Sequence, residues 1–373
     1  IQFNNGGQTD ISGWNTSNVT NMINMFTGSS FNQPIGEWNT ANVTNMIGLF
    51  MDSNFNQPIG EWDVSKITNM NVLFYNTPFN QDISSWNTSN VTHMGQMFES
   101  ATVFNQNIGK WDVGNTTNME YMFYHAFAYN NNGQEDISGW NTSNVVTMEG
   151  MMADSVFNQP IGTWDVSKVT TMNTMFYNTP FNQDISGWIT SNVTDMMNMF
   201  TRASQFNQSI INWDVSKVIT MYEMFEGAPR FNKNIRSWNT MNVTDMSNMF
   251  NSATAMNDRF NGFYGYGNTP SNTFFNVDYI TDTYFTSEIT NWFDNSQNSQ
   301  FIDPINNPYY SPLPFWETEL VTNMSNSFLN RTTFNKNIGN WNLENVTNTT
   351  SMFNGAIQFN NGGQTDISGW NTS

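Results

Sequence analysis

Residues 55–98 contain one sequence unit twice: FNQPIGEWDVSKITNMNVLF at 55–74 and, after the linker YNTP, FNQDISSWNTSNVTHMGQMF at 79–98. The pattern F-N-x-x-I-x-x-W-[N/D]-[T/V]-x-x-V-T-x-M-x-x-M-F recurs along the chain, with starts at Phe3, Phe31, Phe55, Phe79, Phe104, Tyr129, Phe157, Phe181, Phe206, Phe231, Phe334 and Phe359. Adjacent starts are 24 or 25 residues apart, except for two steps of 28 and one long interruption. A fixed period of this size predicts a solenoid, in which each unit forms one coil and stacks on its neighbours.

Each coil has two apolar segments with different spacing. Phe79 and Ile83 are four residues apart, which places both side chains on one face of an extended strand. The pattern V-x-x-M-x-x-M-F, as in residues 91–98, has the spacing of the buried stripe of a short helix. The sequence therefore predicts a short parallel strand and a short helical segment in each coil, with twelve to thirteen coils in all.

Stacking would place each repeated side chain above its counterpart, about 4.8 Å away. The Asn that follows Phe would then form a ladder of side-chain amides, each donating to the next, at positions such as Asn32, Asn56, Asn80 and Asn105. We expect the Phe and Trp residues to stack in similar columns. Most of the 25 Met residues are assigned to the core.

Two further regularities concern the loops. The turn after Trp alternates between W-N-T, as at Trp38, and W-D-V, as at Trp62, which indicates duplication of a two-coil unit. The two 28-residue steps share a glycine-containing insertion, Gly6-Gly7-Gln8 in one and Gly133-Gln134 in the other. Insertions at one phase of a repeat are predicted to be loops on one face of the solenoid.

A longer periodicity links the two ends of the sequence. Residues 1–17, IQFNNGGQTDISGWNTS, recur unchanged as residues 357–373, although neighbouring coils differ freely. We interpret the chain as one 356-residue block of a longer tandem array, with the next block just begun. The alternative is a duplicated terminal segment that serves end-to-end docking.

Residues 256–315 interrupt the rhythm and are rich in aromatic residues and proline. The sequence thus divides into coils one to ten at 1–255, this insertion at 256–315, and resumed coils at 316–373. One hypothesis is that the insertion contacts a ligand or a neighbouring chain, because Tyr and Trp are favoured at interfaces. The alternative is a small satellite core folded onto the solenoid. The candidate contact residues are Tyr264, Tyr266, Phe274, Phe275, Tyr279, Tyr284, Trp292, Tyr309 and Tyr310.

Composition excludes several classes of partner. The 373 residues include 30 acidic and 11 basic residues, which gives a net charge of −19. Binding to nucleic acid or to an anionic membrane requires a surface rich in Lys and Arg, so we expect neither. Cysteine is absent, which excludes disulfides and thiolate metal sites. No apolar run approaches the ~20 residues of a membrane span.

Catalytic patterns are also missing from the sequence. The two histidines, His93 and His125, have no partner at a metal-ligand spacing and do not suggest a nucleophile-activating arrangement. Carboxylates recur before the coil Ile at Asp82, Asp136 and Asp184, and again at Asp366, but intervening coils break the column. We therefore predict a non-catalytic protein without a cofactor, with calcium kept as an alternative at these carboxylates.

The chain is dense in N-x-[S/T] acceptors for N-glycosylation, which would apply in a secretory pathway. The alternative is that N-V-T is simply part of the coil motif. The acceptors are Asn15, Asn18, Asn42, Asn87, Asn90, Asn115, Asn141, Asn192, Asn207, Asn242, Asn323, Asn330, Asn345, Asn348 and Asn371.

The stretches FNQPIGEWDVSKITNM, FNQDISSWNTSNVTHMGQMF and FNQPIGTWDVSKVTTMNTMF resemble the repeat of the BspA-like surface proteins, divergent relatives of the leucine-rich repeats. The resemblance covers residues 1–255 and 316–373. It implies a right-handed solenoid like that of leucine-rich repeats, located at a cell or particle surface, with adhesive or structural roles and no catalytic residues.

Block identity and the repeat together lead us to expect a structural subunit of an extracellular or surface filament. Its partners would be copies of itself, packed end to end or laterally. The alternative function is a surface adhesin that binds proteins or glycans through residues 256–315.

Overall fold

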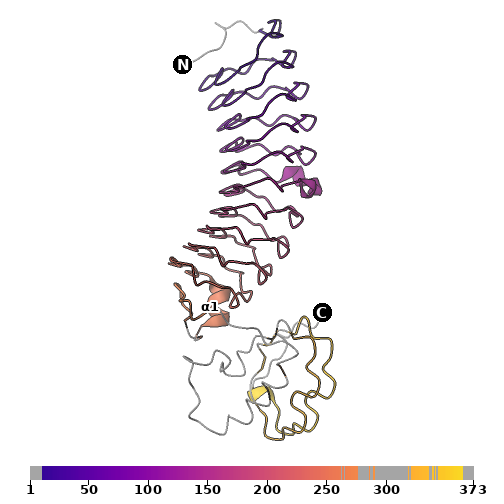
Figure 1. Ribbon diagram of the computed structural model, residues 1–373, viewed down its shortest axis with the longest axis vertical. Helices are drawn as coiled ribbons and strands as arrows, with labels where there is room; N and C mark the ends of the chain where they lie inside the picture. Colours follow the sequence, from indigo (N-terminus) through magenta and orange to yellow (C-terminus); the bar gives the residue numbers. More distant parts are fainter. Residues whose placement is uncertain are drawn as a thin grey trace. The chain divides into compact units, whose positions relative to one another are not determined.

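The computed structural model describes residues 11–275 apart from 262 and 264, together with residues 285, 289, 318, 321–335, 338, 339, 341 and 343–363. The chain forms two compact units, Ile1–Phe275 and Asn276–Ser373. Figure 1 shows the coils of the first unit stacked one upon another, coloured from indigo to orange. This arrangement confirms a solenoid-like stack of tandem repeats.

Regular secondary structure is sparse in the described residues. One α-helix, α1, spans Thr254–Phe260, and 3-10 helices occur at Asn131–Gly133 (η2), Glu135–Gly139 (η3) and Asn361–Gly363 (η5). No extended strand forms within the described coils. Neighbouring coils are instead joined by isolated parallel β-bridges, one pair per interface, in a column that runs from Asn69 through His93 and Asn118 to Asp245.

The V-T-x-M-x-x-M-F segment and the two residues after it form a series of turns, which we call the turn row. In one coil, four alternate amides donate to carbonyls of the next coil: Met70 to His93, Val72 to Gly95, Phe74 to Met97 and Asn76 to Glu99, at 2.7–3.1 Å. Of the amides between them, Leu73 and Tyr75 donate three residues back within the same coil, and Asn71 donates to the Asn69 side chain. Half of the backbone donors therefore join coils and half close turns.

Two residues of each turn row, four positions apart, adopt the left-handed backbone region. Their φ angles lie between 50° and 64° in the first unit. The first column contains Asn24, Gly48, Val72, Gln96, Tyr121, Gly150, Thr174, Asn198, Glu223 and Asn248, and the second contains Gly28, Asp52, Asn76, Ser100, His125, Asp154, Asn178, Arg202, Gly227 and Ser252. These residues reverse the chain direction repeatedly, which is why the row cannot continue as an α-helix.

The predicted strand and helix of each coil are both wrong for the described residues. The stretch from Phe79 to Ile83, predicted to be a strand, has no bridge to a neighbouring coil, and the stretch 91–98, predicted to be a helix, contains the bridge and the turns. The apolar stripe itself is buried as expected, because Val91, Met94 and Phe98 are fully enclosed. Successive three-residue turns bury the same spacing that a short helix would.

The core consists of aromatic columns. Phe31, Phe55, Phe79 and their successors up to Phe231 stack with ring centroids 5.7–6.5 Å apart. Each Trp from 38 to 238 is buried, and its indole Nε1–H donates to the Ile carbonyl of the preceding coil at 3.0–3.3 Å. Burial of a Trp leaves no unsatisfied donor in this arrangement.

The asparagine column forms a ladder, but with donors different from those expected. Each Asn side chain accepts, through Oδ1, the backbone N–H of the Asn in the next coil at 2.8–3.2 Å, from Asn32 to Asn232. In several coils the neighbouring Gln adds a second donor to the same oxygen, as Gln81 does to Asn56 at 2.9 Å. The Asn side chains therefore accept backbone N–H groups that, in a β-strand, would donate to the carbonyls of a neighbouring strand.

Alternation of the Trp turns has a structural counterpart. In three coils the buried Thr hydroxyl donates to the Asp carbonyl of the next coil at 2.8–2.9 Å, from Thr88 to Asp112, from Thr142 to Asp165 and from Thr190 to Asp214. The buried hydroxyl of Thr40 has no such partner. In W-D-V coils the same place is taken by a buried Val such as Val113. The Lys of these coils donates to an Asn of the preceding coil, as Lys66 does to Asn42 at 2.9 Å.

The described part of the second unit repeats this coil plan. A bridge joins Asn323 to Asn348, and Phe328 stacks on Phe334 at 4.0 Å. Its core contains Phe285, Ile289, Val321, Met324, Phe328, Phe334, Ile338, Trp341, Leu343 and Met352.

Candidate interaction surfaces

The described part of the aromatic segment closes the stack of the first unit. Phe260 of α1 and Phe274 are fully buried, and Phe274 lies against Phe250 of the last full coil at 6.1 Å. Arg236 lies over the Phe274 ring, 5.6 Å from its centroid, and its Nε donates to the Phe274 carbonyl. These contacts build the satellite core that the sequence left as an alternative.

Burial limits the candidate contacts in this segment. Phe274 and Phe275 are enclosed in the core, and Tyr266 is half-buried with its hydroxyl donating to Asn257 at 2.7 Å. They are therefore packing residues of the first unit, which ends at 275 and so includes the first twenty residues of the predicted insertion. Tyr264, Tyr279, Tyr284, Trp292, Tyr309 and Tyr310 lie outside the described residues, and their contact role stays a prediction.

The turn row gathers aromatic and acidic side chains that sequence reasoning did not group together. Five of the six tyrosines before residue 256 lie on it, at Tyr75, Tyr121, Tyr124, Tyr177 and Tyr222. Their shared position within the repeat was the available signal. Burial, followed by a hydrogen bond to Glu149, raises the pKa of Tyr121, so its phenol stays protonated at neutral pH.

His125 is at the centre of a polar cluster on this row. Its Nε2 lies 3.1 Å from Asp154 Oδ2, and its ring stacks on Tyr124 with centroids 3.8 Å apart. Asn178 donates to the second oxygen of Asp154 at 2.6 Å. Burial raises the pKa of the nearby Glu99 carboxyl. Asp154 thus joins His125 to Asn178, and the imidazole stacks on the phenol ring of Tyr124.

Within the described residues, no three His, Asp or Glu side chains lie close enough to hold a metal ion. Asp82, Asp136 and Asp184 are separated by coils without a carboxylate at that place, and Asp366 is not among the described residues. Calcium binding therefore stays a prediction. No helix in the described part of the chain has the length and apolar character that a membrane span needs.

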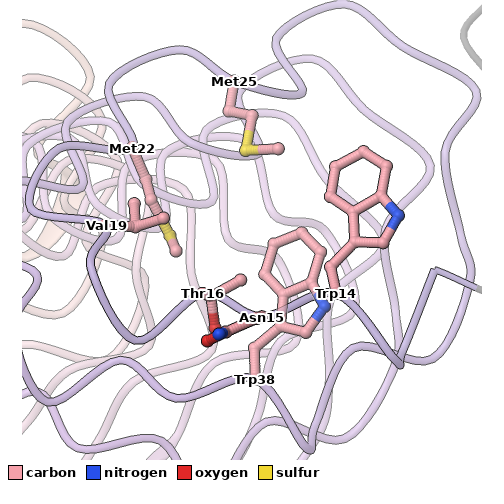
Figure 2. Close-up of a pocket in the computed structure, with 7 residues that line it drawn as sticks. All are labelled: Trp14, Asn15, Thr16, Val19, Met22, Met25 and Trp38. Atoms are coloured by element: carbon pink, nitrogen blue, oxygen red, sulfur yellow. The ribbon is translucent and has the colours of Figure 1, made fainter.

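The first described coil has an uncovered face. Figure 2 shows a hollow lined by Trp14, Asn15, Thr16, Val19, Met22, Met25 and Trp38. Trp14 is 50% exposed, whereas the tryptophans from 38 to 238 are at most 4% exposed. Trp14 stacks on Trp38 on one side, at 6.0 Å, so the exposed area is on its other side.

An internal coil shows how such a face is covered. Residues 129–140, YNNNGQEDISGW, match residues 3–14, FNNGGQTDISGW, position by position. Trp140 is only 3% exposed, and its Nε1 donates to the carbonyl of Ile108 in the preceding coil at 3.3 Å. Asn131, which is fully buried, accepts the amide of the same Ile108 at 2.9 Å. The glycine insertion thus belongs to a specific junction between two coils.

The same junction recurs in the second unit, between coil 334–356 and the residues from 357 on that repeat the sequence of residues 1–17. Asn361 accepts the amide of Ile338 at 2.8 Å, as Asn131 accepts that of Ile108. Asn335 Oδ1 accepts the amides of Asn360 and Gly362 at 2.8 and 2.9 Å, and Asn105 accepts those of Asn130 and Asn132 in the same way. The residues that begin the second copy of the 17-residue sequence are therefore seated on the preceding coil like an internal coil.

Comparison with known families agrees with this repeat geometry. Five segments match the family described as Mycoplasma protein of unknown function, DUF285: residues 2–78, 51–135, 127–189, 178–292 and 296–373. The chain belongs to the DUF285 family. The DUF285 matches also extend over residues of the interruption. No curated protein and no solved structure matches the chain. The match confirms a tandem-repeat family, and the likeness to BspA-like proteins stays a resemblance.

The glycosylation acceptors of this DUF285 chain lie mostly at the surface. Exposed acceptors are Asn15, Asn18, Asn42, Asn87, Asn90, Asn115, Asn141, Asn192, Asn242, Asn323, Asn330 and Asn345, half-buried ones are Asn207 and Asn348, and Asn371 lies outside the described residues. Several N-V-T side chains already donate to the preceding coil, as Asn90 does to Ser65 at 2.7 Å. A sugar on Nδ2 would leave one hydrogen for that contact. Glycosylation stays a prediction.

Proposed function

We propose that this chain is a structural block of an extracellular or surface filament built from tandem solenoid blocks, and that it has no catalytic role. One observation carries the proposal: the coil that begins the second copy of residues 1–17 is joined to coil 334–356 by the bonds that join internal coils. Stacking that continues across a block boundary gives a rod whose length grows with block number. A surface location accords with the resemblance to BspA-like proteins.

The composition supports a structural role as well. Lys, Arg, Asp and Glu make up only 11% of the chain, and its polar surface comes mainly from Asn, Thr, Ser and Gln. Such a surface can form many hydrogen bonds between neighbouring rods, and salt screens the repulsion between their net charges of −19. Lateral packing of copies is therefore part of the proposal.

Electron microscopy of the native material tests the filament directly. Twelve to thirteen coils, with separations between the ~4.8 Å of bridged backbones and the roughly 6 Å of the stacked rings, predict an axial repeat of about 60–80 Å per 356-residue block. Continuous density with this repeat is the expected result. Isolated short rods with free ends would contradict the proposal.

The alternative function, adhesion through residues 256–315, depends on the part of that segment that the structure does not describe. A chain lacking residues 290–315 tests it without touching the buried Phe274 and Phe275 of the first unit or the buried Phe285 and Ile289 of the second. Loss of cell or glycan binding with the rod intact would favour adhesion, and loss of filament assembly would favour the structural role. The matched control is a chain in which the same stretch is replaced by a Gly/Ser linker of equal length.

A further inference from the structure

We propose that Tyr75, Glu99 and Tyr124 form a binding site for an arginine side chain of a partner protein, which we call the Glu99 site. The contacting segment of the partner is basic, and its guanidinium group pairs with the carboxylate beside the two phenol rings. This inference goes beyond the proposed function and does not depend on it, because all three residues lie in internal coils of the first unit.

The register of the coils places the three residues in one column of the turn row. Asn76 follows Tyr75, and its amide donates to the Glu99 carbonyl at 2.7 Å. In the same way, the Ser100 amide, next to Glu99, donates to the Tyr124 carbonyl at 2.7 Å. All three side chains are half-buried. A carboxylate therefore lies between two phenol rings in three successive coils.

The charge of Glu99 reaches both tyrosines. It is the largest cause of the raised pKa of Tyr75, followed by burial and by the charge of Asp52. Burial is the largest cause of the raised pKa of Tyr124, followed by the charges of Asp154 and Glu99. Both phenols therefore stay protonated at neutral pH, and their rings offer neutral π faces to a cation beside the carboxylate.

Glu99 itself lacks a cationic partner in the chain. Gln96 Nε2 donates to one of its oxygens at 2.8 Å, and no Lys or Arg of the described residues forms a salt bridge with it. Burial raises the pKa of the Glu99 carboxyl, although the hydrogen bond from Gln96 and the nearby His125 oppose this shift. Partial loss of water around the carboxylate is a cost that a bound cation would offset.

The turn rows of the first seven coils carry charge of one sign. Between residues 19 and 178 these rows contain Asp52, Glu99, Glu120, Glu149 and Asp154 but no Lys or Arg. The lysines of these coils are placed near the Trp turns instead. The row thus presents a negative face, and charge complementarity points to a basic partner.

One arginine of the chain shows how such a cation is held. Arg202 lies over the Tyr177 ring, 5.9 Å from its centroid. Tyr177 has the same place in the repeat as Tyr75 and Tyr124, so a guanidinium group fits over a tyrosine of this column. Between Tyr75 and Tyr124 the chain supplies a carboxylate and no arginine, and a partner must therefore provide the cation.

Exposed apolar side chains border the Glu99 site. Val103, Phe127 and Val156 are 46%, 54% and 49% exposed, and they lie in the loops that follow three successive turn rows. The Phe127 ring is 5.8 Å from the His125 ring, which stacks on Tyr124 at 3.8 Å. Neighbouring exposed apolar groups rimmed by polar residues mark protein interaction sites. A basic segment with apolar residues beside its arginine therefore fits this surface better than a free cation.

A short peptide, acetyl-Leu-Arg-Gly-Arg-Leu-amide, tests the site on the full chain by isothermal titration calorimetry at low ionic strength. Its control carries citrulline in place of each arginine, which keeps the shape and removes the charge. We expect the arginine peptide to bind roughly tenfold more tightly than the citrulline peptide, with an affinity that falls as salt is added.

Glu99→Gln should weaken binding of the arginine peptide roughly fivefold, because it replaces a charged pair by a neutral hydrogen bond. The new amide oxygen can still accept from Gln96, and circular dichroism and the urea midpoint verify that the variant is folded. Glu61→Gln is the matched control, since it makes the same change in charge at an exposed position near a Trp turn, and should leave binding unchanged. Tyr75→Leu should weaken binding about threefold.

Three results would overturn the Glu99 site: no binding of the arginine peptide, equal binding of both peptides, or equal effects of Glu99→Gln and Glu61→Gln. Binding of a neutral oligosaccharide such as maltohexaose, lost in Tyr75→Leu and without binding of the arginine peptide, would assign the surface to glycans instead. Filament assembly enters none of these measurements, so this proposal and the proposed function fail separately.

Discussion

Each coil requires two backbone reversals that L-residues adopt reluctantly. Asn, Gly and Asp tolerate the left-handed region best, and they occupy many of these places, as at Asn24, Gly48 and Asp52. Among the other residues at these places, Val72 and Thr174 are β-branched and carry the largest steric cost. Neighbouring coils hold these residues in the left-handed conformation, so the fold tolerates the steric cost. A substitution that adopts this conformation more easily should remove that cost.

Val72→Asn should stabilise the first unit by roughly 1 kcal/mol, because Asn relieves the steric cost of the left-handed conformation. The reverse change in an equivalent position, Asn198→Val, should destabilise it by a similar amount. Urea unfolding followed by Trp fluorescence measures both. Shifts of the same sign in the two variants would show that side-chain packing, not backbone conformation, dominates at these places.

At the scale of the single coil, the sequence pattern predicted burial well and secondary structure poorly. The stripe V-x-x-M-x-x-M-F at 91–98 is buried, yet it bends at Gln96 and Ser100 into turns. A helix and a series of turns bury the same spacing, so periodicity could not separate them. A distinguishing signal was the enrichment of Asn, Gly and Asp at two places of the repeat, as at Gly48 and Asp52, because a helix interior disfavours these residues.

The candidate contact residues likewise show what the sequence could and could not predict. Aromatic composition marked residues 256–315 but could not tell which rings face the core, because a cap and a binding surface both favour Phe and Tyr. Phe274 and Phe275 proved to be packing residues. The Asn-based junction at 129–140 was visible only as an insertion, since its role depends on a buried contact with Ile108 in another coil.

The turn after Trp gives a pH-dependent prediction. Hydrogen bonds from Ser65, through its hydroxyl and then its backbone amide, hold the pKa of Asp63 below its ordinary value, and Ser167 does the same for Asp165. A carboxyl with a lowered folded-state pKa contributes stability that is present above its unfolded pKa of about 3.9 and is lost as pH falls through the folded value. Stability should therefore decline on acidification below about pH 4.

Asp63→Asn/Asp165→Asn should remove part of that decline, because Asn forms the same turn without titrating, as Asn39 does with the Ala41 amide. Urea midpoints at pH 7 and pH 3 measure the difference. The control, Glu37→Gln/Glu61→Gln, makes the same change in charge at exposed positions outside these turns. An equal effect of both double variants would assign the pH dependence to net charge instead.

At the scale of the whole molecule, the stability of the solenoid is approximately the sum of contributions from the interfaces between neighbouring coils. Coils can therefore be added or removed, but the order of the coil types matters. The Thr hydroxyl of several coils contacts the Asp carbonyl of the following W-D-V coil, as Thr142 does with Asp165 in a W-N-T coil and Thr190 with Asp214 in a W-I-T coil. Two W-D-V coils in succession lack this bond. The natural unit of change is therefore the coil pair.

Deletion of residues 157–205, one coil pair, should shorten the first unit by about 10 Å and keep most of its stability. Deletion of residues 181–205 alone places two W-D-V coils together and should lower the unfolding midpoint more, although it removes fewer residues. Small-angle scattering measures the length and urea unfolding the stability. Greater damage from the longer deletion would refute the coil pair as the structural unit.

The direction of the tryptophan bonds has a consequence for symmetry. From Trp38 to Trp238 every indole donates toward the preceding coil, so one face of each coil carries the indole donor and the opposite face carries the Ile carbonyl. Two faces of the same kind cannot satisfy each other, so a two-fold contact between coil faces is disfavoured. A contact that continues the stack is heterologous, and such contacts generate open, polar fibres whose growth has no closed endpoint.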